Sequence, residues 1–392
     1  MGRLTRAQTQ ERNRAKVLAA ARDEFAERGF RDAKIDAIAE RADLTRGAVY
    51  SNFPGKRALY FAVLADLAER VPEPAASEPR HTTREALGAF ARAWLTRLPL
   101  TTDARPGSAR LGMDLMPEIL ADERTRRPFA QLMKLDALLL GLALERLRPA
   151  GEPAGRLVRQ AESVLTTLHG AAQLDAAAPG FVEPFNVVGV CEHLAGLDLG
   201  DVWRPPHIPF ISQARPADEP WSPPPVVDAV RDEPVELTDD GVVAVLGLHR
   251  LGAAEEAVRA APPNAVITLV LVTGDPGELA PLARLTVAEL RACLRRAFPP
   301  PVWPRLRVVH DETGAVAAAA GVPAVSDETE VAVRVSSGRV RARADGRGAC
   351  HAAASATVTT PPHGTVPPTG AVPAAGTEPS TGTMPTAGNQ RG

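Results

Sequence analysis

The sequence contains little that would support redox, metal or disulfide chemistry. It has 3 cysteines in 392 residues, with no Cys-x-x-Cys pair and no histidine at a zinc-binding spacing; they are Cys191, Cys293 and Cys350. An odd number of widely separated thiols argues against a disulfide framework and indicates a reducing, cytoplasmic compartment. We therefore expect no metal site and no cofactor.

Long hydrophobic runs are also missing. The N-terminus carries several arginines and no apolar segment of the kind that a signal peptide needs. The longest apolar run, residues 137–144, lies between Asp136 and Glu145 and is too short to cross a bilayer. The pattern predicts a soluble intracellular protein without membrane contact.

Aromatic residues make up only 4% of the chain, which predicts aliphatic, alanine-rich cores. A length of 392 residues indicates two or three domains. Residues 1–60 contain 13 Lys and Arg against 8 Asp and Glu, a net charge of +5, whereas the whole chain carries −2, which leaves −7 for the rest. A basic N-terminal segment on an acidic body is typical of a local nucleic-acid footprint.

The most informative stretch runs from Lys34 to Lys56. Its first part predicts a short helix, because its apolar residues recur at helical spacing; they are Ile35, Ile38, Ala39 and Ala42. The chain then turns at Asp43–Leu44, where aspartate tolerates a left-handed conformation and leucine supplies an apolar plug. Thr45 is positioned as the N-cap of a second helix.

The second helix is predicted from Arg46 to about Phe53, and Pro54 ends it. One side presents Arg46, Gly47, Tyr50 and Ser51, while the apolar residues Ala48, Val49 and Phe53 face the protein. Two short helices joined by a tight turn, the second displaying hydrogen-bonding groups, are the pattern of a helix-turn-helix that enters the major groove of DNA.

The run IAERADLTRGAVYSNFPGKRAL resembles the DNA-binding signature of the TetR family of bacterial transcriptional regulators, and the resemblance covers about the first 70 residues. The family usually has glycine where this chain has Asp43, and a hydroxyl residue where Lys34 stands; Asp32 is a substitute cap. The resemblance implies that Arg46 contacts base edges or phosphate, and that Lys56 contacts the DNA backbone. The full set of expected DNA-binding residues is Lys34, Thr45, Arg46, Gly47, Tyr50, Ser51, Asn52 and Lys56.

The residues around this motif complete an N-terminal domain, predicted over 11–71. We expect residues 1–10 to form a flexible arm, which is either a solvated tail or a DNA-contacting arm. A helix is predicted from Glu11 to Arg28, ended by Gly29, and a fourth helix begins at Lys56. Residues 72–80 read as a proline-rich linker.

Residues 81–200 read as all-helical, with segments over 81–98, 111–120, 129–147, 157–168 and 187–194. The resemblance implies that this part binds an effector and forms a homodimer through its last two helices. Few charges lie on these helices, so we expect the effector to be apolar or aromatic. The candidate effector-pocket residues, each of which is alternatively ordinary core, are Phe90, Trp94, Met113, Met116, Phe129, Met133 and His169.

Many prolines interrupt residues 201–236, which predicts a stiff, extended linker. A separate α/β sandwich is predicted over 237–356, with strands over 242–248, 265–272 and 306–309 and a hairpin over 331–343. This part resembles a thioredoxin-like domain in which Pro323 stands at the cis-proline. No cysteine follows the first strand, so the resemblance implies a catalytically silent version. Residues 357–392 are rich in Thr, Pro, Gly and Ala and are predicted to be a disordered tail.

The leading hypothesis is a multidomain, homodimeric transcriptional regulator, usually a repressor in the resembled family, that binds a palindromic operator in double-stranded DNA and responds to a small molecule. We expect no catalytic residue and no enzyme activity. Two alternatives stay open. One is a regulator fused to an α/β module with enzymatic or redox activity, and the other is a helical protein-interaction scaffold.

Overall fold

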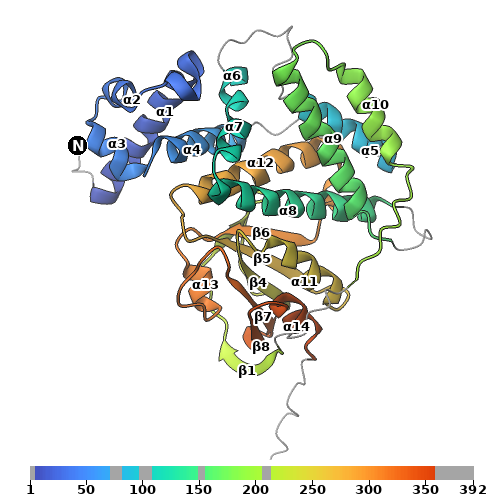
Figure 1. Ribbon diagram of the computed structural model, residues 1–392. Coiled ribbons are helices and arrows are strands. Elements are labelled where there is room, and N and C mark those ends of the chain that lie inside the picture. Colours follow the sequence, from blue (N-terminus) through green and yellow to red (C-terminus); the bar gives the residue numbers. More distant parts are fainter. Residues whose placement is uncertain (1–4, 71–81, 97–107, 149–154, 205–212, 358–392) are drawn as a thin grey trace, which may run out of the picture. The chain divides into compact units, whose positions relative to one another are not determined.

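A computed structural model describes residues 5–70, 82–96, 108–148, 155–204 and 213–357. The first four helices, shown in blue in Figure 1, are α1 (Arg6–Asp32), α2 (Ile35–Arg41), α3 (Arg46–Asn52) and α4 (Lys56–Glu69). Thr5 caps α1 and exchanges a reciprocal pair of hydrogen bonds with Gln8. Residues 6–10 are helical, so the prediction of a flexible arm is wrong for them. Gly29, at φ 75°, kinks α1 at the position where we predicted its end.

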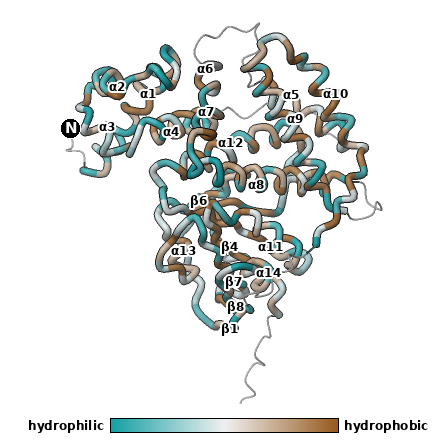
Figure 2. Tube along the Cα trace, in the orientation of Figure 1, coloured by the Kyte–Doolittle hydropathy of each residue, from teal (hydrophilic) through white to brown (hydrophobic). Residues whose placement is uncertain are grey.

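Among the described residues six further helices follow, where five helical segments were predicted. They are α5 (Thr83–Leu95), α6 (Ser108–Met113), α7 (Leu115–Leu120), α8 (Glu123–Leu147), α9 (Val158–Ala177) and α10 (Pro184–Leu194). The numbers differ because two short helices, α6 and α7, stand in place of the segment predicted over 111–120. In Figure 2, brown and teal residues alternate along α8 and α9, as expected for helices with one buried face. The predicted linker at 72–80 and nearly all of the predicted tail lie outside the described residues.

The C-terminal part contains a mixed sheet of six strands in the order β1-β8-β7-β4-β5-β6. Strands β4 (Gly241–Gly247), β5 (Val266–Val272) and β6 (Leu306–His310) are parallel, and the hairpin of β7 (Glu330–Ser336) and β8 (Arg339–Asp345) adds to the sheet with β7 antiparallel to β4. Parallel strands are buried on both faces, which explains their continuous Val, Leu and Ile runs. The helices of this part are α11 (Ala254–Ala260), α12 (Leu279–Ala297), α13 (Ala315–Ala319) and α14 (Ala349–Ser355).

The segment predicted as an extended linker is partly sheet. Strand β1 (Arg215–Pro220) pairs with β8 at the edge of the sheet, and β2 (Val226–Asp228) and β3 (Glu233–Val235) form a hairpin. Trp221 is buried and its indole N–H donates to the carbonyl of Leu237. The prediction of a linker was therefore wrong for residues 215–235.

The expected separation of the α/β part from the helices was also wrong. Helix α12 contacts α4, α5 and α8, and Figure 1 shows α8 and α12 between the sheet and α5. One hydrophobic cluster joins the helices to the face of the sheet that carries Val242 and Ala244, whereas the opposite face, with Val243 and Val245, packs against α13 and Trp221. The described residues up to Ala356 form one compact unit.

The thioredoxin-like expectation fails at one position. No peptide bond among the described residues is cis, so Pro323 does not form the expected cis-proline. As the sequence showed, His249 and Arg250, not cysteine, follow β4. Cys293 and Cys350 are both buried.

Candidate nucleic-acid interface

The turn between α2 and α3 has the predicted geometry. Asp43 adopts the left-handed conformation at φ 55°, and the Leu44 amide donates to the carbonyl of Ala39 at 2.9 Å. The Thr45 hydroxyl accepts the Ala48 amide at 3.2 Å, which satisfies one of the donors that a helix N-terminus leaves unpaired. These local bonds fix the direction in which α3 leaves the turn.

Helix α3 is divided into a buried face and an exposed face. Val49 and Phe53 are 1% and 2% exposed and pack in the core. The residues on the other face are exposed, with Tyr50 at 41%; they are Thr45, Arg46, Gly47, Tyr50 and Ser51. A Cβ added to Gly47 would approach only the Thr45 hydroxyl oxygen, at 3.8 Å, so the backbone there is open to a close partner.

Arg46 is the cation at the start of α3. One of its terminal nitrogens lies 3.4 Å from the Asp36 carboxylate, and its guanidinium carbon lies 5.5 Å from the centre of the Tyr50 ring. Tyr50, and then Asp36, raise the pKa of Arg46 above its ordinary value. Because the Arg46 and Asp36 side chains are 61% and 70% exposed, this ion pair is weak and leaves the guanidinium free to move onto another acceptor.

The remaining polar residues of the predicted set are in different environments. Lys34 is the exposed N-cap of α2 and makes no side-chain capping bond; Asp32 ends α1. Asn52 is half-buried and donates to the carbonyl of Ala48 at 2.8 Å. Ser51 donates to the same carbonyl at 2.9 Å. The hydroxyl and amide groups beside Tyr50 are thus held by local bonds.

Lys56 lies closer to the protein than we predicted. Its ammonium donates to the carbonyl of Arg31 at 3.0 Å and lies 4.7 Å from the centre of the Phe30 ring. Burial lowers the pKa of Lys56, against the opposing effect of Glu118 and Asp32. A DNA phosphate would have to compete with these contacts for the ammonium, and the predicted phosphate contact stays a prediction.

Sequence reasoning missed two residues that support the interface. Glu24 is completely buried in α1, and its carboxylate accepts from Arg41 of α2 at 3.3 Å and from the Lys34 amide at 3.4 Å. Arg14 donates to the carbonyl of Asn52 at 3.4 Å and covers the Phe53 ring at 4.6 Å, which closes the end of α3. Charged residues on a helix read as surface, so only the packing of α1 against α2 and α3 reveals these roles.

The predicted effector-pocket residues are partly brought together. The His169 ring centre lies 4.6 Å from that of Trp94 and 6.2 Å from that of Phe129. Phe90 is fully buried, whereas Met113 is 48% exposed; Met116 and Met133 are half-buried. Three residues of the set, Trp94, Phe129 and His169, thus form an aromatic group, while the other four differ in exposure. A role of the set in effector binding stays a prediction.

Residues 17–63 match the family model described as bacterial regulatory proteins, tetR family. These residues are the helix-turn-helix domain of the TetR family. Over 65 residues the chain is 45% identical to the HTH-type transcriptional regulator SrpR of Pseudomonas putida, a match that covers 17% of this chain and 30% of SrpR. It is also 45% identical over 65 residues to the HTH-type transcriptional regulator TtgW of the same species, covering 17% of this chain and 48% of TtgW. The chain thus spans less than half the length of either relative.

Solved structures of TetR regulators are similar over a longer stretch. A TetR transcriptional regulator from Rhodococcus sp. RHA1 is 18% identical, covers 48% of this chain and 94% of its own, and has a TM-score of 0.31. NalD, the secondary repressor of the MexAB-OprM multidrug efflux pump in Pseudomonas aeruginosa, is 22% identical. The match covers 47% of this chain and 93% of NalD, with a TM-score of 0.30. Likeness at this level carries no argument about function.

Among the described residues, no helix is both long and apolar enough to span a bilayer. Within the same residues, His, Cys, Asp and Glu side chains form no cluster of three or more that could hold a metal ion.

Proposed function

We propose that the protein is a DNA-binding transcriptional regulator that acts as a homodimer in the cytoplasm and responds to a small molecule. The observation that carries this proposal is the division of α3. Its inner residues Val49 and Phe53 lock it onto the domain, while Arg46 and Tyr50 remain exposed beside Gly47. Such a helix can enter a major groove, where a guanidinium pairs with guanine through two hydrogen bonds.

The last two helices of the helical part support the homodimer. Large apolar side chains are exposed on or beside α9 and α10, with Leu174 at 49%, Phe181 at 72%, Phe185 at 85% and Val190 at 49%. Exposed apolar residues gathered in one region are typical of a protein interface. A twofold dimer formed there would place two copies of α3 on a palindromic operator, with half-sites about one helical turn of DNA or a multiple apart.

The α/β part completes the proposal as a catalytically silent, thioredoxin-like module. Its support is the predicted order of parallel strands followed by a hairpin, together with the absence of a thiol after β4. A thiolate at that helix start is what a disulfide-exchange reaction requires. We infer that this part serves binding and not catalysis.

Selection of bound sequences from a random duplex pool, followed by titrations at several salt concentrations, tests DNA recognition. Arg46→Ala should reduce the preference for the selected sequence by about tenfold or more, which corresponds to the loss of one base contact of about 1–3 kcal/mol. Tyr50→Ala should weaken binding to all duplexes and lower the salt slope by about one. Arg126→Ala removes an exposed arginine from α8 and is the matched control.

Lys56→Ala separates two roles of that lysine. If Lys56 holds a phosphate, the variant loses about one unit of salt slope while its melting temperature stays near that of the wild type. A lower melting temperature with an unchanged salt slope would show that Lys56 acts only through Phe30 and Arg31. Absence of salt-dependent duplex binding in the wild type contradicts the proposed function.

Sedimentation of Phe185→Glu tests the dimer. A charge buried at the interface without a partner should convert the protein to a monomer and abolish high-affinity operator binding. Leu120→Glu is the control, because Leu120 is also exposed, at 58%, but lies on α7. A Phe185→Glu protein that remains dimeric would place the interface elsewhere.

A further inference from the structure

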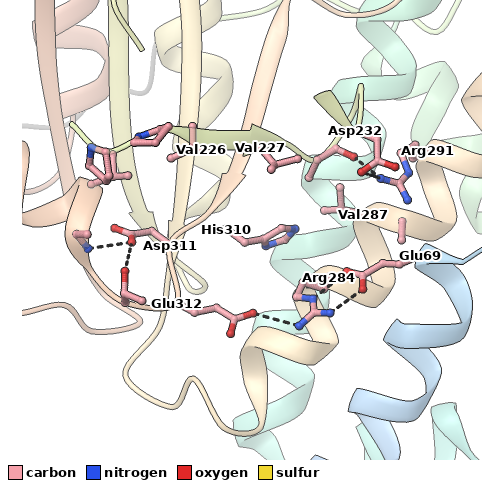
Figure 3. Close-up of a pocket in the computed structure, with 17 residues that line it drawn as sticks. Glu69, Val226, Val227, Asp232, Arg284, Val287, Arg291, His310, Asp311 and Glu312 are labelled. Carbon is pink, nitrogen blue, oxygen red and sulfur yellow. Dashed lines mark hydrogen bonds and ion pairs between the residues drawn. The ribbon is translucent and has the colours of Figure 1, made fainter. Parts of the chain in front are cut away.

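A cavity of about 570 Å³ lies where α4, α12, the β2 strand and the end of β6 meet. Figure 3 shows its polar residues Glu69, Arg284 and His310 facing the same space as Val226, Val227 and Val287. This volume is within the range of pockets that enclose small organic ligands. None of the residues predicted for an effector pocket lines it.

The ionised side chains of the cavity are paired with one another or, at Asp311, accept the backbone amides of Ala315 and Ala317. Arg284 holds the Glu69 carboxylate through two hydrogen bonds, at 2.8 and 2.6 Å, and lies 3.3 Å from Glu312. Arg291 lies 3.0 Å from the Asp232 carboxylate. A charged ligand would have to break one of these ion pairs and leave its partner uncompensated, so the cavity favours an uncharged occupant.

His310 is a polar residue of the cavity that belongs to none of these ion pairs. Figure 3 shows its ring directed into the cavity, and no hydrogen bond joins the ring to another described residue. Burial, and then the neighbouring Arg284, lower the pKa of His310 to about 4, so the ring is neutral near pH 7. A neutral imidazole offers one N–H donor and one nitrogen acceptor, which suits a hydroxyl, carbonyl or amide group.

A second cavity, of about 230 Å³, adjoins the first through the segment from His310 to Thr313. It is lined by Leu248 after β4, by residues 272–274 at the end of β5 and by residues that follow β6. The space outside the carboxyl ends of parallel strands is where open α/β sheets bind ligands. The two cavities thus place His310 between a chamber lined by valines and ion pairs and a sheet edge suited to binding.

The cavity is connected to the helix-turn-helix through α4. Glu69 is the last residue of α4, and its partner Arg284 belongs to α12. At the other end of α4, Arg57 pairs with Glu278, the residue that precedes α12, and lies 3.1 Å from Asp122. Since both ends of α4 are held by ion pairs to α12 or its N-cap, a change at Glu69 alters the support of the helix that follows α3.

We propose that this cavity binds an uncharged, mainly apolar small molecule through one hydrogen-bonding group placed on His310. We further propose that the Glu69–Arg284 pair transmits its occupancy to α4 and changes the affinity for DNA. The binding step stands independently, whereas the transmission step rests on the proposed DNA-binding function.

Titration of the full chain with three probes that share one ring system tests the binding step. The probes are 1-naphthol, naphthalene, which lacks the hydrogen-bonding group, and 1-naphthoate, which carries a charge. We expect 1-naphthol to bind at least tenfold more tightly than either comparator. His310→Phe should reduce the affinity for 1-naphthol to that for naphthalene.

Two further variants locate the bound probe. Val227→Trp should fill the cavity and lower the affinity for 1-naphthol at least tenfold; because Val227 is 51% exposed, the larger side chain should not prevent folding. Trp94→Leu alters the aromatic group of the helical part and should leave 1-naphthol binding unchanged. Failure of 1-naphthol to bind, or loss of its binding in Trp94→Leu and not in His310→Phe, overturns the proposal.

Duplex titrations with and without saturating 1-naphthol test the transmission step. We expect a change in the duplex dissociation constant of about fivefold or more, the usual lower range of allosteric coupling. At 1-naphthol concentrations that saturate each variant, Glu69→Gln should lose this change in duplex affinity, whereas Glu123→Gln, on the exposed surface of α8, should keep it. An unchanged duplex affinity overturns transmission, while a wild-type protein that binds 1-naphthol but no duplex overturns the proposed function and leaves the cavity assignment in place.

Discussion

The surroundings of each charged residue decide whether its ionised form is favoured or disfavoured. In Glu256 of α11 the ionised carboxylate is disfavoured. Its Oε2 atom is buried and has no hydrogen-bond partner among the described residues. Burial, and then the neighbouring Glu330, raise the pKa of Glu256 to about 7. By contrast Glu330 itself is paired with Arg250 and accepts the Gly348 amide at 2.8 Å.

Stability should therefore fall as pH rises. An unfolded glutamate titrates near pH ~4.3, so between about pH 4.3 and 7 the folded state binds more protons than the unfolded state, and the free energy of unfolding decreases with pH. Glu256→Gln imitates the protonated side chain and should be more stable than the wild type above about pH 7, with the difference vanishing near pH ~4. Urea unfolding at several pH values measures this.

The matched control for Glu256→Gln is Glu40→Gln, because Glu40 is exposed on α2. That variant should follow the pH dependence of the wild type. A Glu256→Gln protein whose stability runs parallel to the wild type at every pH would mean that Glu256 is ionised in the folded state without cost.

At the scale of elements, the chain builds part of its sheet from a segment that looks like a linker. Trp221 follows β1, is 5% exposed and packs with Val243 and Val245 on one face of the sheet. Trp221→Ala should lower the free energy of unfolding by about 3–5 kcal/mol, the usual cost of removing a buried tryptophan. Arg204→Ala, at an exposed position of the same predicted linker, should cost almost nothing. If the two variants are equally stable in chemical unfolding, then Trp221 does not anchor this segment and the prediction of a linker over residues 201–236 holds.

The elements that sequence predicted are those in which local rules agree with packing. The β-branched runs of β4 and β5 and the cap at Thr45 act over a few neighbouring residues, so their pattern is visible in the sequence. Strand β1 was missed because Pro216 and Pro220 argue against a strand, yet an edge strand tolerates proline where the missing N–H would face solvent.

The candidate site likewise has one part that the sequence predicts and another part that it does not. The exposed face of α3 follows from helical spacing alone, and its burial pattern confirms it. The supports of that face could not be predicted, because Glu24 meets Arg41 across 17 positions of sequence and Arg14 meets Asn52 across 38. The cavity at His310 depends on α4, α12 and β6 together, and no short motif encodes such a meeting of distant segments.

For the whole molecule, the decisive feature is that α12 packs against both the preceding helices and the sheet, within one hydrophobic cluster. Leu282, Leu285 and Leu290 of α12 are at most 2% exposed, and α12 contacts α4, α5 and α8 while it shares a hydrophobic cluster with the sheet. Burial of such a side chain contributes about 1.5–3 kcal/mol. The helices that precede residue 200 therefore depend on a helix that the chain supplies only after them, at Leu279–Ala297.

A chain cut after residue 200 tests this dependence. Without α12, the apolar faces of α4, α5 and α8 become exposed, so we expect the fragment to bind 8-anilinonaphthalene sulfonate, to lose near-ultraviolet circular dichroism and to aggregate. A chain cut after residue 357 retains α12 and should behave as the full chain does. If the shorter fragment instead stays monodisperse, melts cooperatively and binds the selected duplex with full affinity, then the α/β part is an independent attachment. The route from the His310 cavity to α3 would then have no physical basis, because a DNA-binding head that stands without α12 cannot depend on the Glu69–Arg284 pair.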